Sequence, residues 1–246
     1  MTPAELRRYL EFYRDLGVSD LYRREQVAQT SVCVAVAEPP QPPQKMEVEL
    51  PPMTPSGETL FQILEHVGDC RRCRLHEGRN KLVFGVGNER SPLVFVGEGP
   101  GADEDAQGIP FVGRAGQLLT QMIENTARKE GMPLRREDVY ICNVVKCRPP
   151  GNRTPEPDEM EICGQFLYRQ LTSIHPKAIC ALGGTAARAL TGHKEGVTKM
   201  RGRWFEWRDI PVLVTYHPSY LLRPYNQNAK REAWEDLKKV LHFVYD

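Results

Sequence analysis

Short apolar runs alternate with amphipathic stretches along the chain from about residue 58 to its end. The apolar runs lie between glycine, proline and polar residues, which is typical of strands buried on both faces of a parallel sheet. The stretches between them repeat apolar residues at helical spacing. We therefore predict an α/β fold, a three-layer α/β/α arrangement around a central, mainly parallel four-stranded sheet. The strands are expected at 93–96, 139–145, 178–182 and 212–215, and the helices near 114–130, 155–173, 184–191 and 228–243.

The N-terminal part of the chain has a different pattern. Thr2-Pro3-Ala4-Glu5 fits a capping box with proline at the first helical position, so residues 2–16 are predicted to form an amphipathic helix. Proline is then so frequent between residues 39 and 55 that this stretch cannot pack a core. We divide the chain into a leader (1–30), a proline-rich linker (31–57) and a main domain (58–246). The leader helix would either pack loosely on the main domain or dock a partner protein.

Composition narrows the class of protein. The chain has 246 residues, of which 40% are hydrophobic and 26% charged, so it can bury a core without covalent staples. No apolar run reaches the roughly 18 residues that a membrane helix needs, and the N-terminus has no signal-peptide pattern, so we expect a cytoplasmic protein with no membrane contact. The net charge of +1 neither demands nor excludes a polyanionic partner. An odd count of 7 cysteines favours thiol or metal chemistry over a disulfide framework.

The cysteines suggest a metal site. Cys70 and Cys73 form a C-x-x-C pair after a helix-like run at 59–68, while Cys147 and Cys163 flank a proline-rich loop. Four thiolates from two distant segments could hold zinc or an iron–sulfur cluster. The second pair is too widely spaced for an ordinary zinc ribbon, and spacing alone leaves both metals open. Cys142 and Cys180 lie within predicted strands and are expected to be core residues.

Loops at the carboxyl ends of parallel strands are where α/β proteins bind ligands. The loop after the first strand carries Gly97, Gly99 and Gly101 and then an acidic run, so it is neither a Walker loop nor a triphosphate pocket. Phe111 in the same segment is either a core residue or a stacking platform for a flat ligand. Asn143 at the end of an apolar strand is either a satisfied structural amide or a reader of a nucleobase edge.

The loop after the last predicted strand adds a histidine and an apolar tip. His217 sits where a catalytic residue would lie, and Pro218 fixes the turn. A lone histidine at a strand end is more often structural, but here other loops accompany it. Tyr220, Leu221 and Leu222 beside Arg223 have the composition of a wedge that enters a base stack.

Together these motifs resemble the family 4 uracil-DNA glycosylases, the iron–sulfur-containing type, over about 58–246. The resemblance rests on the following stretches: GEGPGADED at 97–105, PFVGRAGQ at 110–117, NVVKCRPPGNR at 143–153 and HPSYLLR at 217–223. The four cysteines match the family's cluster ligands in order and spacing. The leader and the linker lie outside the resemblance.

The resemblance implies a uracil-DNA glycosylase fold and an enzyme of DNA repair. Such an enzyme flips uracil out of single- or double-stranded DNA and hydrolyses the N-glycosidic bond, leaving free uracil and an abasic site. The residues that it implies are catalytic His217, Glu98 and Glu104; substrate-binding Gly99, Phe111, Asn143 and Ser219; DNA-contacting Tyr220, Leu221, Leu222 and Arg223; and a structural [4Fe–4S] cluster on Cys70, Cys73, Cys147 and Cys163. We expect a monomer whose partner is uracil-containing DNA, with the leader helix docking a repair or replication protein.

The sequence offers more than one candidate for the water-positioning residue, for the role of the arginines and for the function. Better-known uracil glycosylases carry an aspartate where this chain has Gly99, so Glu98, Glu104 or Asp105 would have to position the water. The arginines near the cysteines would either contact DNA phosphates or balance the charge of the cluster: Arg71, Arg72, Arg74, Arg148 and Arg153.

The alternative function is that of a family relative that does not turn over, or of a metal-stabilised DNA-binding module. A branch that traps its product through a histidine-bearing loop is disfavoured, because 199–204 has no histidine.

Overall fold

The structure is a computed structural model that describes residues 57–223 and 226–246. The predicted leader and nearly all of the predicted linker lie outside these residues, and the proposed domain boundaries stay a prediction. All described residues belong to one compact unit, Val48–Asp246. Within the described residues, none of the helices has both the length and the apolar character that crossing a membrane requires.

The sheet has six strands in the order β1-β3-β2-β4-β6-β5. Its centre is parallel and matches the four predicted strands: β3 Tyr140–Asn143, β2 Leu93–Gly97, β4 Ala178–Leu182 and β6 Ile210–Thr215. The prediction of four strands is corrected by two short antiparallel edge strands, β1 Val86–Gly87 and β5 Trp204–Trp207. β1 has only two residues and β5 is half exposed, so neither gives the apolar run of a buried strand.

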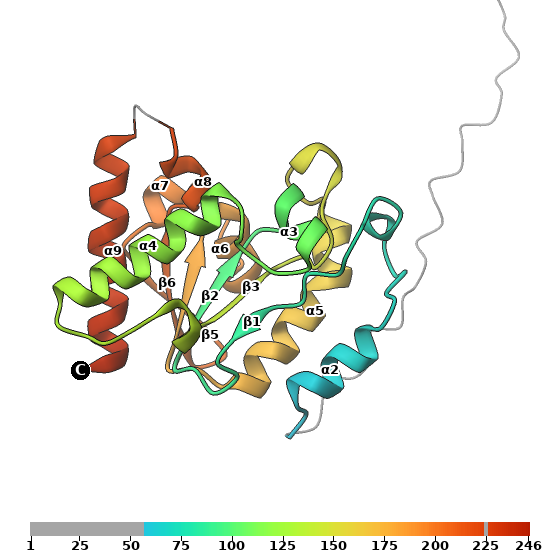
Figure 1. The fold of residues 1–246 in the computed structure, drawn as a ribbon, viewed down its shortest axis with the longest axis horizontal. Coiled ribbons are helices and arrows are strands. Elements are labelled where there is room, and N and C mark those ends of the chain that lie inside the picture. Colours follow the sequence, from blue (N-terminus) through green and yellow to red (C-terminus); the bar gives the residue numbers. More distant parts are fainter. Residues whose placement is uncertain (1–56, 224–225) are drawn as a thin grey trace, which may run out of the picture. The chain divides into compact units, whose positions relative to one another are not determined.

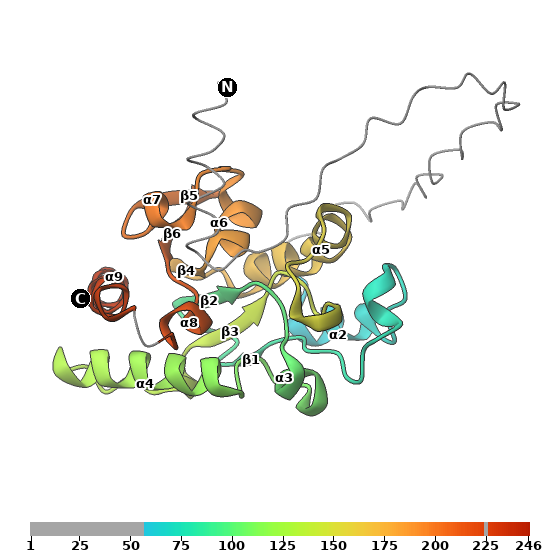
Figure 2. The same ribbon diagram turned by 90° about the horizontal axis from the view of Figure 1, so that it is seen from above.

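Helices cover both faces of the sheet, which confirms the predicted three layers (Figures 1 and 2). Alternate strand residues point to opposite faces: Val94 and Val96 belong to one apolar cluster, Leu93 and Phe95 to the other. The first cluster includes residues of α2 Leu60–Val67, α5 Pro157–Ile174 and α6 Gly184–Thr191; the second includes residues of α4 Arg114–Lys129 and α9 Gln227–Tyr245.

Short elements fill the connections between the strands and the long helices. They are the α-helices α3 Ala102–Gln107, α7 Val197–Met200 and α8 Pro218–Leu221, and the 3₁₀ turns η1 Arg74–His76, η2 Arg136–Asp138 and η3 Pro150–Asn152. The four central strands run in one direction, so their carboxyl ends meet at one edge of the sheet. The segments that leave this edge carry the motifs singled out in the sequence.

Candidate active site

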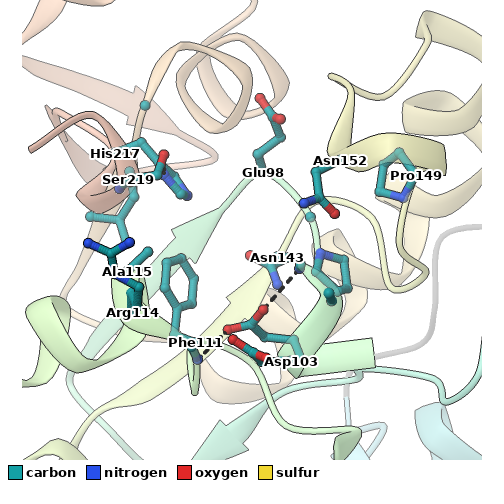
Figure 3. Close-up of a pocket in the computed structure, with 18 of the residues that line it drawn as sticks. Glu98, Asp103, Phe111, Arg114, Ala115, Asn143, Pro149, Asn152, His217 and Ser219 are labelled. Carbon is teal, nitrogen blue, oxygen red and sulfur yellow. Dashed lines mark hydrogen bonds between the residues drawn. The ribbon is translucent and has the colours of Figure 1, made fainter. Parts of the chain in front are cut away.

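A cavity of about 440 Å³ opens at the carboxyl edge of the parallel strands. Residues from the segments after β2, β3, β4 and β6 line it. Figure 3 shows the side chains that the segments after β2, β3 and β6 contribute. Every residue that the sequence assigned to catalysis or substrate binding lines this cavity: Glu98, Gly99, Glu104, Phe111, Asn143, His217 and Ser219. Segments far apart in the chain therefore converge on one space that is large enough for a small flat ligand.

Asn143 forms the floor of the cavity. It is the last residue of β3, it is 1% exposed, and neither its amide nitrogen nor its amide oxygen has a hydrogen-bond partner within the described residues. Leaving such a group unpaired costs about 1–3 kcal/mol, so a buried amide facing a cavity indicates a ligand that pairs with it. Gly97 on the neighbouring strand makes the space, because a Cβ there would collide with Asn143 Oδ1 and the Phe111 ring.

Phe111 forms one wall beside this amide. Its backbone has φ of 54°, a left-handed conformation that bulky residues rarely adopt. The start of α4 presses against it, since a Cβ at Gly116 would overlap the Phe111 carbonyl group. The ring of Phe111 lies 5.6 Å from the ring of His217, centroid to centroid, at an angle of 36°. The segment thus accepts local strain to present an aromatic face to the cavity.

Glu104 ties the loops around Phe111 together. Its Oε1 accepts hydrogen bonds from the backbone N–H groups of Val112 at 2.9 Å and Gly113 at 2.8 Å, and its Oε2 accepts from Gly101 at 3.1 Å. Three backbone donors leave this carboxylate little capacity to bind a water, so the geometry favours a positioning role. Asp105 does not line the cavity; it is buried and accepts hydrogen bonds from Asn80 instead.

His217 presents a defined tautomer to the cavity. The backbone N–H of Ser219 donates to His217 Nδ1 at 3.2 Å, and Ser219 Oγ lies 2.7 Å from the same nitrogen. An amide can only donate, so Nδ1 accepts and the proton of the neutral imidazole sits on Nε2. Burial lowers the pKa of His217 to about 4. At neutral pH the site therefore holds an uncharged ring with an Nε2–H donor.

The other carboxylate at the cavity, Glu98, follows β2 directly. Its Oε2 accepts a hydrogen bond from the Thr185 hydroxyl of α6, which leaves Oε1 for another partner. Gly99 beside it fits closely against the next loop, because a Cβ there would come within 2.8 Å of Val145 Cγ2. Glu98 thus lies at the cavity (Figure 3), and Thr185 engages one of its oxygens.

The apolar tip after His217 divides into exposed and buried parts. Tyr220 is 40% exposed and stacks on Tyr216, with 5.2 Å between centroids, and the Arg223 guanidinium lies 5.9 Å from its ring centroid. Leu222 is half-buried. Leu221 is 0% exposed and packs in an apolar cluster with Ala229 and Ala233. The sequence led us to expect a DNA contact at Leu221; in this structure the turn of α8 directs Leu221 inward, where it anchors the loop.

All four predicted metal ligands line a second, small cavity. Cys70 and Cys73 follow α2, Cys147 lies in the loop after β3, and Cys163 lies on α5. The other lining residues are the apolar Val67, Leu82, Ile162 and Phe166, together with His76 and Lys146. No group of three His, Cys, Asp or Glu side chains within the described residues has the geometry of a single-ion site.

Positive and N–H groups point at the sulfur atoms. Arg72 Nη1 donates to Cys70 Sγ at 3.3 Å, Arg79 Nη1 to Cys147 Sγ at 3.2 Å, and the Lys146 backbone N–H to Cys163 Sγ at 3.2 Å. Donors of this kind stabilise thiolates that ligate metal. The donor set therefore fits a thiolate-bound metal group.

The remaining arginines near the cysteines are paired with acidic or polar groups. Arg74 and Arg153 both donate to the buried carboxylate of Glu159, and these bonds hold the pKa of Glu159 at about 2. Arg148 donates to Asn152 Oδ1, and Arg71 pairs with Asp69 on the surface. Arg79 was missed in the sequence because only the fold brings it to Cys147.

Comparisons with known proteins agree with this geometry. A profile of the uracil DNA glycosylase superfamily matches residues 84–238. The type-4 uracil-DNA glycosylase of Thermotoga maritima is 49% identical over 76% of this chain and 96% of that relative. The type-4 enzyme of Archaeoglobus fulgidus is 43% identical over 74% of this chain and 92% of its own, and that of Sulfurisphaera tokodaii is 42% identical over 74% and 84%. The chain therefore belongs to the type-4 uracil-DNA glycosylases of the uracil DNA glycosylase superfamily.

Proposed function

We propose that this protein is a monofunctional glycosylase that removes uracil from single- and double-stranded DNA and leaves an abasic site. The observation that carries the proposal is the unpaired, buried amide of Asn143, which faces a cavity between Phe111 and His217. The Thermotoga maritima and Archaeoglobus fulgidus relatives are both named uracil-DNA glycosylases, which supports the same reaction. The cavity admits a base only after the nucleotide has rotated out of the stack.

Recognition of uracil follows from the donor and acceptor of one amide. The Asn143 NH₂ group would donate to uracil O4, and its carbonyl oxygen would accept from N3–H. Cytosine presents the opposite pattern at these positions, so it would leave both groups mismatched at a cost of about 1–3 kcal/mol each. Phe111 would stack on the ring and contribute roughly 1–3 kcal/mol that does not depend on the base.

The chemistry needs a donor where negative charge develops. Breaking the C1′–N1 bond leaves a uracil anion with charge on O2, and the Nε2–H of His217 is placed to donate to it. The sugar becomes cation-like and is attacked by water. We propose that Glu98 positions this water or stabilises the cation with its remaining oxygen, while Glu104 holds the loops of the cavity in place.

DNA would meet the apolar tip beside the cavity. Tyr220 and Leu222 are our candidates for filling the gap that the flipped nucleotide leaves, with Arg223 next to them and Leu221 as their anchor. Unstacking costs a few kcal/mol in a duplex, so single-stranded DNA should be the easier substrate.

We propose that Cys70, Cys73, Cys147 and Cys163 hold a [4Fe–4S] cluster, with Arg72 and Arg79 donating to its thiolates. When bound, the cluster supplies a cross-link between chain segments and no step of the hydrolysis. The four thiols come from segments before β1, after β3 and on α5. The loop between Cys147 and Cys163, which contributes Pro149, Asn152 and Arg153 to the active-site wall, would be fixed at both ends.

All the side chains proposed for the reaction come from one chain, which suits a monomer. None of the cysteines within the described residues forms a disulfide, which suits a reducing, cytoplasmic setting. The leader, outside the described residues, is proposed to dock a repair or replication partner.

The proposal is tested with an oligonucleotide that carries one uracil. Purified protein is incubated with it in the presence of a chelator, and alkali then cleaves the strand wherever a base has been lost. Cleavage at uracil alone, with matched cytosine and thymine oligonucleotides intact, supports the proposal. A folded, metal-loaded protein that leaves all three oligonucleotides intact would refute it.

Asn143→Asp should change which base is accepted. An ionised carboxylate cannot donate to uracil O4 but can accept from the amino group of cytosine. The substitution removes the hydrogen bond to uracil O4 and places a carboxylate oxygen against it, which is repulsive. We therefore expect kcat/KM for uracil to fall by about 10–100-fold and cytosine excision to become detectable. Asn125→Asp is the control, because it makes the same change at an exposed position of α4. Unchanged selectivity in Asn143→Asp would exclude this readout.

The proton of His217 can be located directly. Because burial holds its pKa at about 4, the ring should stay neutral from pH 8 down to pH 5 and gain a proton only as the pH approaches 4. Nitrogen-15 NMR of the ring at pH 7 should show an unprotonated Nδ1 and a protonated Nε2. A His217 signal that titrates near pH 6.5, or a protonated Nδ1 at pH 7, contradicts this assignment.

A further inference from the structure

Lys146 is a fully buried lysine that the proposed reaction does not use. It is 1% exposed and lies between Asn143, which faces the active-site cavity, and Cys147, which lines the cysteine cavity. Burying an ammonium group is costly unless hydrogen bonds compensate it. A residue of this kind at this position therefore calls for a physical reason.

The side chain of Lys146 holds the backbone that carries the base-reading amide. Its Nζ donates to the Asn143 carbonyl oxygen at 2.7 Å and to Gln170 Oε1 at 2.5 Å. Gln170 on α5 in turn donates through Nε2 to the Tyr140 hydroxyl and to the Phe84 carbonyl, both at 3.1 Å. The end of β3 is thus connected to α5 through the Lys146 amino group.

The backbone of Lys146 makes a hydrogen bond to one of the cysteines of the cysteine cavity. The Lys146 N–H donates to Cys163 Sγ at 3.2 Å, and its carbonyl accepts from the Val83 N–H at 2.9 Å. Cys163 also lies on α5, the helix that carries Gln170. One residue therefore contacts a proposed metal ligand with its main chain and the carbonyl group of Asn143 with its side chain.

We propose that Lys146 is a positioning residue that couples the cysteine cavity to the base-reading amide of Asn143. The amide has no partner of its own within the described residues, so its direction depends on how its backbone is held. Fixing that backbone from α5 keeps the amide aimed at the base. The inference rests on the proposed function, in which Asn143 reads uracil, and it adds how the thiol site supports that reading.

The test compares binding of two uncleavable oligonucleotides to Lys146→Met. One carries 2′-fluoro-2′-deoxyuridine, which presents uracil; the other carries a tetrahydrofuran abasic analogue, which presents no base. The substitution should misdirect the Asn143 amide and so weaken both of its hydrogen bonds to uracil. We expect the affinity for the uracil oligonucleotide to fall by about tenfold, while the affinity for the abasic oligonucleotide changes by less than about twofold. Iron content, measured on the same samples, should match the wild type.

Lys177→Met is the matched control, because Lys177 Nζ also donates to a backbone carbonyl, that of Val244, away from the cavity. It should bind both oligonucleotides as the wild type does. Gln170→Leu is the second variant in case Lys146→Met does not fold: it removes the hydrogen bond between Lys146 and α5, and it should weaken uracil binding selectively but less.

The outcomes separate the inference from the proposed function. If the wild type excises uracil and the folded variants bind both oligonucleotides normally, or lose both equally, the coupling role is wrong. If the wild type does not excise uracil, the proposed function itself fails. Selective loss of uracil binding with iron retained supports the coupling.

Discussion

Replacing His217 by alanine is expected to lower kcat for uracil excision by about 10²–10³-fold, the usual effect of losing one preorganised donor to a developing anion. The Nε2–H is the group that would meet the charge on uracil O2, and its orientation is fixed by the Ser219 N–H. Binding should change little, because Asn143 and Phe111 supply the proposed ground-state contacts. The loss should therefore fall on kcat and not on the affinity for uracil-containing DNA.

Single-turnover excision rates and equilibrium binding affinities, measured on the same preparations, test whether the loss falls on kcat alone. His193→Ala is the matched control, since His193 packs on Phe205 and does not line the active-site cavity. It should keep wild-type rates. Normal turnover in His217→Ala would remove this residue from the reaction, and an equal loss of binding would make its role structural.

Cys147→Ala is expected to lose the metal group and much of the protein's stability. Cys147 joins the β3 loop to the other thiols, and its removal also leaves Arg79 without its sulfur acceptor. Structural metal sites contribute several kcal/mol to folding, and at roughly 2–4 °C per kcal/mol for a chain of this size the midpoint of thermal unfolding should fall by about 10–20 °C.

Elemental analysis, visible absorbance and thermal unfolding test this expectation together. Cys180→Ala is the control, because Cys180 is equally buried but lies in β4 in the apolar cluster on the other face. It should keep its iron and lose only about 1 kcal/mol, as for other small cavities. Full iron content in Cys147→Ala would exclude the ligand assignment, and a wild type that contains zinc alone would exclude the cluster.

The sequence predicted the centre of the fold because that centre obeys simple periodicities. The β4 run 178–182 and the α6 run 184–191 were placed at their observed limits, since Gly183 separates the two elements and Gly192 ends α6. The edge strand β1 could not be predicted, because two residues carry no period. The antiparallel strand β5 begins with the exposed Trp204, so its sequence lacks the apolar pattern that would have predicted a strand beside β6.

Site residues were predictable where a motif places them at the end of a central strand. Asn143 is the last residue of β3 and His217 follows β6, and their convergence follows from the parallel strands. Contacts set by tertiary packing were not predictable. Three contacts depend on segments that come from elsewhere in the chain: the packing of Leu221 on α9, the hydrogen bond from Arg79 to Cys147, and the bridge from Lys146 to α5.

The measurement that tests the central claim most directly is the number of free uracil molecules released per protein molecule. Excess single-stranded oligonucleotide with one uracil is incubated with iron-loaded protein and chelator, and free uracil is quantified by mass spectrometry alongside alkali-labile sites. A turnover enzyme should release uracil in many-fold excess over protein, with one abasic site for each uracil. Release of no uracil, or of at most one molecule per protein with a stable protein–DNA adduct, would contradict hydrolytic turnover.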